Sequence, residues 1–294
     1  MFEAMPCIAV RLRPSFPLPP FTSILMLLRL GFSTCPNDTF MFDALVHGRI
    51  DTGGYRFAVQ LGDIFHLNQL AKAGELDMVK VSYNTYAQVR DRYHLLDAGS
   101  ALGHNCGPLL ISREPISPER LAAGDLRVAI PGANTTANLL LGFFAPHLTN
   151  KVELIFHEIM PALARGAVDL GVIIHENRFT YQQHGLRLVR DLGEYWERET
   201  GLPIPLGAIV ARRSLDKAVL ADLERLMHAS VAHAFAHPEV SRPYVRTHAQ
   251  EMDPAVMQAH IDLYVNDYSL SLGERGRQAV DKLLATSEAM DLGG

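Results

Sequence analysis

The sequence predicts an α/β protein built from two similar units that face one another across a cleft. The main evidence is a pattern that occurs twice: a helix-ending glycine, a short turn containing Asp, an apolar strand, and a polar residue directly after it. The pattern covers residues 74–82 and again 166–175. In each unit an earlier strand leads into a turn rich in hydroxyl and amide side chains, at 33–39 and 131–137. Since open α/β sheets bind ligands at the carboxyl ends of strands, the doubled pattern predicts one site between the units.

Each element follows from a local signal. Alternating apolar and polar residues predict strands, while capping residues and glycines mark where helices begin and end. The first unit is expected to contain strands at 28–33, 55–61, 77–81, 93–98 and 107–113, and helices at 38–47, 63–72 and 83–90. The second is expected to contain strands at 127–130, 151–156, 169–174 and 186–191, and helices at 135–145, 158–165, 178–184 and 192–199. A strand at 206–211 then returns to the first unit, followed by helices at 216–236, 241–250, 254–265 and 275–289.

These elements predict a discontinuous large domain, 26–115 plus 206–294, and a small domain, 116–205. The chain crosses between the two near 112–118 and again near 203–207. A double crossing of this kind forms a hinge, which suits closure of two domains around a ligand.

Length favours two domains, while composition and charge limit the class of protein. The chain has 294 residues, of which 48% are hydrophobic and 20% charged, as in soluble proteins with a sizeable core. The net charge of -5 implies no basic face for nucleic acid. The three cysteines, at positions 7, 35 and 106, give neither a disulfide framework nor a Cys-x-x-Cys zinc pair. We therefore expect a cytoplasmic protein without a metal site.

Residues 1–25 differ from the rest, because five prolines and two arginines interrupt the apolar residues. A secretory signal instead has basic residues first and then an unbroken apolar run. No segment of the chain approaches the ~20 apolar residues of a membrane span. We expect a disordered extension, with the folded part starting near Met26, and a poor signal peptide is the alternative.

The turn at 33–39 contains Asn37 and Asp38 at the start of a helix. Free backbone N–H groups and the positive end of the helix dipole favour an anion at such a place. Taken alone, however, this stretch is better explained by Asn37 or Asp38 acting as the N-cap.

The matching turn at 131–137 offers the hydroxyl and backbone N–H groups of Thr135 and Thr136. These groups suit a carboxylate or a phosphate, and the neighbouring glycine allows close approach of the backbone. A capped helix is again the alternative. The turn is not a Walker phosphate-binding loop, because no Gly-Lys-Ser/Thr follows.

His175 directly follows the strand at 169–174 and is the strongest candidate for acid–base chemistry near neutral pH. The chain has 13 histidines, so a structural role is the alternative. A glycine-bracketed loop with Asn105, Cys106 and Gly107 is a second candidate wall of the cleft. For Cys106, as for Cys35, a buried neutral thiol is the simpler interpretation, because the sequence indicates no base or electropositive pocket.

Four stretches together resemble the family of 1,4-dihydroxy-6-naphthoate synthases, which acts in the futalosine route to menaquinone. They are Ser-Thr-Cys-Pro-Asn-Asp-Thr-Phe at 33–40, Lys-Val-Ser-Tyr at 80–83, Pro-Gly-x-x-Thr-Thr-Ala at 131–137, and Gly-Val-Ile-Ile-His-Glu-x-Arg-Phe-Thr-Tyr at 171–181. The resemblance runs from about residue 28 nearly to the end of the chain. The first and last stretches together make it specific.

The resemblance implies a two-lobed fold like that of type II periplasmic solute-binding proteins, with the cleft between two α/β domains. It implies a carbon–carbon lyase that converts cyclic dehypoxanthinylfutalosine to 1,4-dihydroxy-6-naphthoate without a metal or redox cofactor. His175 would be the general base, and the two threonines would hold the substrate carboxylate. The substrate-binding residues that the resemblance implies are Asn37, Ser82, Asn105, Cys106, Gly107, Thr135 and Thr136.

Two other functions share this fold. One is a solute-binding protein of a transporter, which the lack of a credible signal peptide disfavours. The other is a chorismate dehydratase of the same pathway, against which the stretch at 175–179 favours the synthase. In each case the expected partner is a small-molecule carboxylate rather than nucleic acid or a membrane, and the sequence leaves the oligomeric state open.

Overall fold

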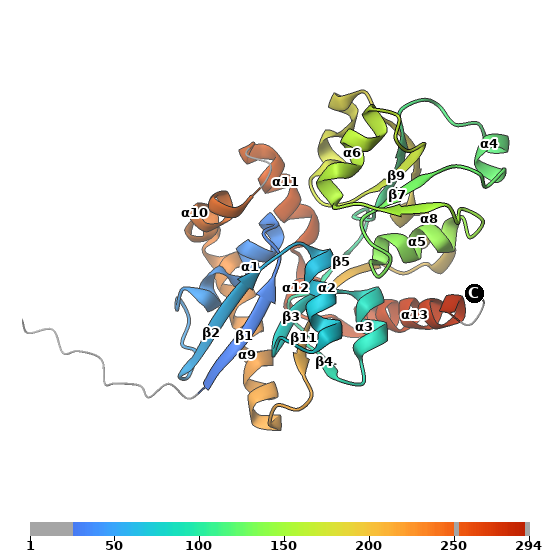
Figure 1. The fold of residues 1–294 in the computed structure, drawn as a ribbon. Coiled ribbons are helices and arrows are strands. Elements are labelled where there is room, and N and C mark those ends of the chain that lie inside the picture. The colour runs from blue at the N-terminus through green and yellow to red at the C-terminus, as the bar shows by residue number, and fades with distance from the viewer. Residues whose placement is uncertain (1–25, 250–252, 292–294) are drawn as a thin grey trace, which may run out of the picture.

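The structure is a computed structural model that describes residues 26–249 and 253–291 (Figure 1). The extension predicted at residues 1–25 lies outside the described residues. Two sheets, each flanked by helices, form two units that lie side by side (Figure 1). The predicted α/β class with two lobes is therefore confirmed.

The first sheet has six strands in the order β2-β1-β3-β11-β4, with β5 also paired to β11. Its strands are β1 (Met26–Phe32), β2 (Tyr55–Leu61), β3 (Met78–Ser82), β4 (Tyr93–Leu95), β5 (Ala101–Gly103) and β11 (Ile204–Arg212). β1 is parallel to β2 and β3, whereas β11 is antiparallel to β3, β4 and β5. β11 thus returns from the second unit to complete the first sheet, as the sequence predicted.

The helices of the first unit come from both ends of the chain. They are α1 (Pro36–Val46), α2 (Ile64–Ala73), α3 (Tyr83–Val89), α9 (Lys217–Ala236), α10 (Pro238–His248), α11 (Pro254–Tyr264), α12 (Asp267–Leu270) and α13 (Gly273–Asp291). α2 has the expected boundaries, because the Asp63 side chain accepts the N–H of His66 and Gly74 ends the helix in the left-handed conformation. α1 differs in detail: its N-cap is Cys35, so Asn37 and Asp38 lie inside the first turn.

β3 lies inside the first sheet, and all five of its residues are buried. Val79 and Val81 pack in a cluster with α2, whereas Met78 packs in a second cluster with α1 and α9. Because strand side chains alternate between faces, Lys80 shares the face of Met78. The alternation therefore directs Lys80 toward the start of α1.

The second sheet has the order β10-β6-β9-β7-β8. Its strands are β6 (Leu109–Ser112), β7 (Val128–Ile130), β8 (Lys151–Glu153), β9 (Leu170–Ile173) and β10 (Arg187–Asp191). Its helices are α4 (Pro118–Ala122), α5 (Thr136–Phe144), α6 (Phe156–Ala164), α7 (Asn177–Thr180), the 3-10 turn η1 (Tyr181–His184) and α8 (Leu192–Thr200). β7 is parallel to β8 and β9, so β7 and β9 end at the same edge and present the α5 turn and His175 together.

The first crossing between the units differs from the prediction. We expected the strand at 107–113 in the first unit and the crossing near 112–118, but β6 pairs with β9 and β10 in the second sheet. The chain therefore crosses between β5 and β6. Alternation in the sequence identified the strand, but its partners depend on long-range pairing that alternation does not encode. The domain division stays a proposal, with its first boundary moved to this segment.

The second crossing leads from α8 into β11, as predicted. The fully buried Trp196 of α8 donates its indole N–H to the Pro203 carbonyl at 3.1 Å. Residues of both sheets, including Val79 and Val172, belong to one hydrophobic cluster. The two units therefore share a packed surface beside the crossings.

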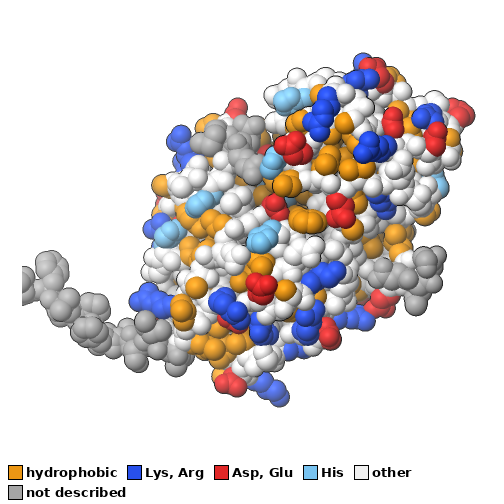
Figure 2. All heavy atoms as spheres, in the orientation of Figure 1, with side chains coloured by type: hydrophobic (Ala, Val, Ile, Leu, Met, Phe, Trp, Pro, Cys, Tyr) orange, Lys and Arg blue, Asp and Glu red, His pale blue; other side chains and the backbone are white. Residues whose placement is uncertain are grey.

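The surface of the described residues carries mixed charge. On the face shown in Figure 2, Lys and Arg side chains are interspersed with Asp and Glu. No helix within the described ranges is long and apolar enough to cross a membrane.

Candidate active site

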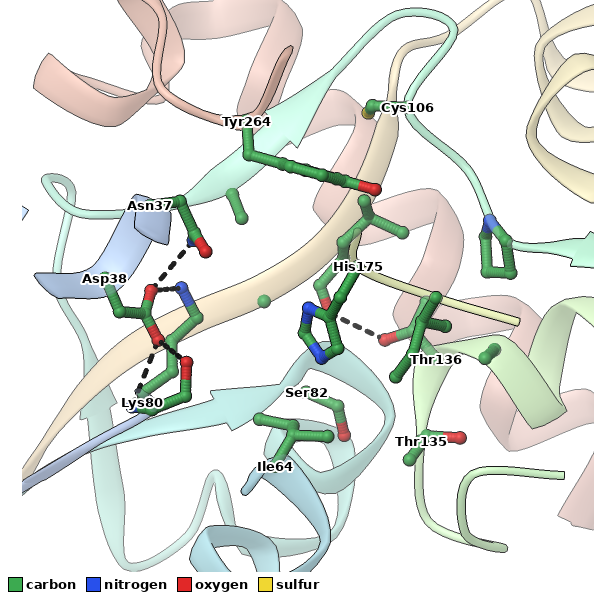
Figure 3. A pocket seen from close by; sticks show the side chains of 17 residues that line it. Asn37, Asp38, Ile64, Lys80, Ser82, Cys106, Thr135, Thr136, His175 and Tyr264 are labelled. Atoms are coloured by element: carbon green, nitrogen blue, oxygen red, sulfur yellow. Dashed lines mark hydrogen bonds and ion pairs between the residues drawn. The ribbon is translucent and has the colours of Figure 1, made fainter. Parts of the chain in front are cut away.

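One cavity brings together most of the residues that the sequence singled out (Figure 3). It holds about 640 Å³ of space not filled by atoms, including its open mouth. The start of α1 and the end of β3 line it from the first unit, and the start of α5 and the end of β9 from the second. The predicted site residues on its wall are Asn37, Ser82, Cys106, Thr135, Thr136 and His175.

Asn105 and Gly107 are not on the cavity wall, which corrects their predicted placement. The exposed Asn105 adopts a left-handed conformation, and its N–H donates to Glu197 of α8 at 2.7 Å. Gly107 packs against the backbone of Gly193, where a Cβ atom would come within 2.3 Å of the Gly193 Cα. Both residues therefore anchor the loop to α8 and leave Cys106 facing the cavity.

His175 is partly buried at the cavity and has a strained backbone, with a positive φ of 56°. Its Nδ1 lies 3.5 Å from the Cys35 Sγ, and its ring meets Phe156 edge to face at 5.1 Å. Burial among these groups lowers the pKa of His175 to about 4, an effect that Asp38 opposes and Lys80 reinforces. The imidazole is therefore neutral at physiological pH.

A second histidine, to which no sequence motif pointed, lies behind the first. His260 of α11 is fully buried, and its ring stacks on that of His175 with 6.1 Å between centroids. Its Nε2 lies 3.0 Å from the Asn37 Oδ1, and its Nδ1 lies 4.0 Å from the Glu176 Oε2. Desolvation lowers the pKa of His260 well below its usual range. Two neutral imidazoles are thus packed together across the two units.

Cys35, which contacts His175, and Cys106, which lies on the cavity wall, are both neutral thiols. Burial raises the pKa of the Cys35 thiol well above its usual range and that of Cys106 to about 12. Nearby carboxylates act in the same direction on each. Neither thiol has the depressed pKa of a nucleophile.

The start of α5 lies on the cavity wall. Thr135 is the N-cap: its hydroxyl accepts the N–H of Asn138 at 3.2 Å and donates to the Gly132 carbonyl at 2.7 Å. The Thr136 hydroxyl donates to the Leu206 carbonyl at 2.9 Å. Both hydroxyl protons are therefore used inside the protein. The backbone N–H groups of Thr136 and Ala137, which have no intrahelical acceptor, are the donors that an anion would meet.

Ser82 ends β3 and joins the two units. Its hydroxyl accepts the N–H of Thr85 at 3.2 Å, which makes it the N-cap of α3. The same hydroxyl lies 2.7 Å from the Asn134 carbonyl of the second unit. Ser82 also lies on the wall of the cavity, and this contact holds the α5 turn beside it.

A buried ion pair, which the sequence analysis did not assign to the site, forms another part of the wall. Lys80 Nζ lies 2.7 Å from Asp38 Oδ1, and both side chains are almost fully buried. A signal was present, since a lysine inside an apolar strand requires a partner. Asp38 as that partner follows only from the packing of α1 on β3.

The wall as a whole offers a neutral imidazole, backbone N–H donors and one ammonium group. Tyr264 of α11 adds a phenol that burial keeps protonated by raising its pKa. Within the described part of the chain, no group of three or more His, Cys, Asp or Glu is arranged to hold a metal ion. The arrangement can bind an anion and accept a proton from a bound molecule.

The chain is similar to solved structures over most of its length. A protein from Archaeoglobus fulgidus is 33% identical with a TM-score of 0.84, covering 90% of this chain and 98% of that one. The periplasmic aliphatic sulphonate binding protein of Escherichia coli is 13% identical with a TM-score of 0.62, covering 91% and 87%. The predicted periplasmic-binding-protein-like fold is confirmed.

Curated relatives are more informative about the family. Proteins named 1,4-dihydroxy-6-naphthoate synthase from Thermus thermophilus and Streptomyces coelicolor are each 49% identical to this chain, over 265 and 273 residues. The matches cover 90% of this chain and 95% and 94% of the relatives. A family model described as menaquinone biosynthesis matches residues 28–289. The chain therefore belongs to the menaquinone biosynthesis family.

Proposed function

We propose that this chain is a 1,4-dihydroxy-6-naphthoate synthase, a lyase that converts cyclic dehypoxanthinylfutalosine to 1,4-dihydroxy-6-naphthoate. The observation that carries the proposal is His175, a neutral imidazole on the wall of a cavity to which both units contribute. Its positive φ of 56° is a strained conformation of the kind that clusters at functional sites. Relatives with this activity in their name support the choice of reaction.

His175 acts as the general base in this proposal. Its Nδ1 faces the Cys35 thiol, which leaves Nε2 for the substrate. Breaking the carbon skeleton requires removal of a proton from carbon, and the released electron pair moves to an oxygen. A positioned general base typically contributes 10²–10⁴-fold to the rate. A bound carboxylate raises the pKa of the imidazole, because a negative charge nearby favours the protonated form.

The start of α5 holds the substrate carboxylate in this proposal. The backbone N–H groups of Thr136 and Ala137 are the donors, and the positive end of the helix dipole adds to the attraction. Thr135 and Thr136 fix the turn through their hydroxyls rather than by touching the anion with them. Ser82 holds the same turn from the first unit.

The test is to incubate the purified protein separately with cyclic dehypoxanthinylfutalosine and with chorismate, and to follow products by chromatography. Formation of 1,4-dihydroxy-6-naphthoate from the first substrate supports the proposal. Dehydration of chorismate instead would identify the sister enzyme of the pathway. Tight binding of a small carboxylate without turnover of either compound would favour a solute-binding protein.

His175→Asn is the variant that tests whether His175 is the base. Asn tolerates the left-handed backbone at this position better than most residues do, but its side chain does not accept a proton at neutral pH. We expect kcat to fall by roughly 10²–10⁴-fold, with substrate binding retained. Near-normal kcat in this variant would make His175 a hydrogen-bonding residue rather than the base.

A further inference from the structure

We propose that Lys80 is a second catalytic residue, whose ammonium group donates a hydrogen bond to the substrate oxygen that becomes negatively charged when His175 removes a proton. This inference rests on the proposed function and adds a role to a residue that the sequence analysis left without one. It follows from how Lys80 is held, from the state of its partner Asp38, and from its place on the cavity wall.

The Lys80 side chain is held in place by its surroundings. Lys80 lies within β3, is only 4% exposed, and is directed toward α1 by the alternation of the strand. Its stem passes over Gly207 of the neighbouring strand β11, where a Cβ atom would come within 2.6 Å of the Lys80 Cε. The missing side chain at Gly207 therefore leaves the space that the lysine occupies.

Asp38 has no remaining capacity to bind a substrate. Its Oδ1 accepts Lys80 Nζ at 2.7 Å and Asn37 Nδ2 at 2.9 Å. Its Oδ2 accepts the Ser33 N–H at 3.2 Å and the Ser33 hydroxyl at 2.7 Å. A carboxylate has about four acceptor sites, and all four are filled. Asp38 therefore orients and balances the ammonium but leaves the contact with substrate to Lys80.

The Lys80 ammonium has donors left for a ligand. It carries three N–H bonds, and Asp38 is its one hydrogen-bond acceptor among the residues that the structure describes. Lys80 lines the same cavity as His175 and Thr136, and Figure 3 shows His175 between the Lys80–Asp38 pair and the threonines. A substrate whose carboxylate lies at the start of α5 would thus extend past the imidazole toward the ammonium.

The chemical step balances without another reactant. His175 accepts the proton from carbon, the C–H electron pair forms a carbon–carbon double bond, and the carbonyl π pair moves to oxygen as an enolate. Lys80 stabilises that oxygen by a hydrogen bond and an opposite charge in a site with little water, where such contacts are strongest. The proton on His175 is then available for return to the substrate in a later step.

The test compares Lys80→Met with the double variant Asp38→Asn/Lys80→Met. The single variant leaves a buried carboxylate without its cation, which destabilises the fold, whereas the double variant removes both charges. We expect kcat to fall by about 10²–10³-fold in both, the usual effect of losing one such donor, with a smaller change in KM. Recovery of near-normal kcat in the double variant would overturn the inference, because Lys80 would then only neutralise Asp38.

Lys151→Met is the control for loss of a partly buried lysine, since Lys151 bonds to Asn138 at 2.8 Å outside the cavity. The Lys151→Met variant should turn over substrate normally.

Absence of turnover in the wild-type protein itself would refute the proposed function and this inference with it. Turnover by the wild type together with an active double variant would refute the inference alone.

A second readout does not depend on turnover. Bound 1,4-dihydroxy-6-naphthoate has a ring hydroxyl whose ionisation changes its absorbance spectrum. If Lys80 stabilises a negative oxygen, the pKa of that hydroxyl is lower in the wild-type complex than in the double variant. Equal pKa values in the two complexes would overturn the inference.

Discussion

The partly buried position of His175 predicts a pH profile that differs from that of an ordinary histidine. Burial lowers its pKa to about 4, from a usual value of 6.5. Because kcat/KM reports the ionisation of the free enzyme, its decrease on the acid side should lie near pH 4 rather than near pH 6.5. Lowering the pH toward 5.5 is therefore the perturbation that separates the two cases.

The size of the difference follows from the two pKa values. At about pH 5.5, an imidazole with a pKa of 6.5 is about 90% protonated, whereas one with a pKa near 4 is about 3% protonated. If His175 is the base, kcat/KM at this pH keeps nearly its full neutral value. A solvated histidine in the same role would retain only about a tenth of it.

The assay measures initial rates at low substrate concentration at constant ionic strength, with circular dichroism at each pH as a check on folding. The comparison is made above about pH 5, because carboxyl groups of the substrate titrate near pH 4. His228→Asn, which removes an exposed histidine of α9, should reproduce the wild-type profile. A midpoint near pH 6.5 in the wild type would refute the assignment of a desolvated His175 as the base.

Further measurements test the site and its supports. Thr135→Ala removes the N-cap of α5 and should lower the free energy of unfolding by about 1 kcal/mol in denaturant titrations. Thr136→Ala loosens the turn that presents the N–H donors. It should weaken substrate binding, measured as a higher KM, by more free energy than it removes from the stability of the fold. Gly107→Ala places a methyl group against the Gly193 backbone and should cost about 1–3 kcal/mol of stability. Because the pKa of His175 is lowered in the folded state, the unfolded state binds more protons below about pH 6.5, so stability should fall between pH 6.5 and 4, and less so in His175→Asn.

Each of these predictions has a control variant or an outcome that would contradict it. Thr135→Ser keeps the capping hydroxyl and should be stable, so loss of stability there would contradict the capping role. An unchanged KM with a lower melting temperature in Thr136→Ala would restrict that residue to a structural role. Gly142→Ala meets only the flexible end of Met290 and should be tolerated, whereas equal loss in both glycine variants would refute the contact argument. Parallel acid unfolding of wild type and His175→Asn would assign the acid sensitivity to other groups.

The local signals in the sequence predicted much of the fold. The repeated glycine-turn-strand pattern located β3 and β9, and capping residues located α2 and α5. His175 was identified because a polar residue directly follows a buried strand. These predictions succeed because strand alternation, helix capping and the conformational freedom of glycine act within a few residues of one another.

Partners that lie far apart in the chain were set by the tertiary structure. The sequence indicated a strand at 107–113, but pairing with β9 and β10 placed it in the second sheet as β6. It indicated a polar loop at 105–107, but packing on α8 holds Asn105 and Gly107 off the cavity wall and leaves Cys106 on it.

The sequence by itself determined which residues end strands and begin helices, and therefore that His175 and the α5 turn would lie at one edge of a sheet. Only the tertiary structure brought His260 from α11 against His175, and Asp38 from α1 against Lys80. Burial then made both imidazoles neutral, because desolvation depends on everything that surrounds a side chain. The candidate base could thus be predicted from a few neighbouring residues, whereas its protonation state depends on the whole fold.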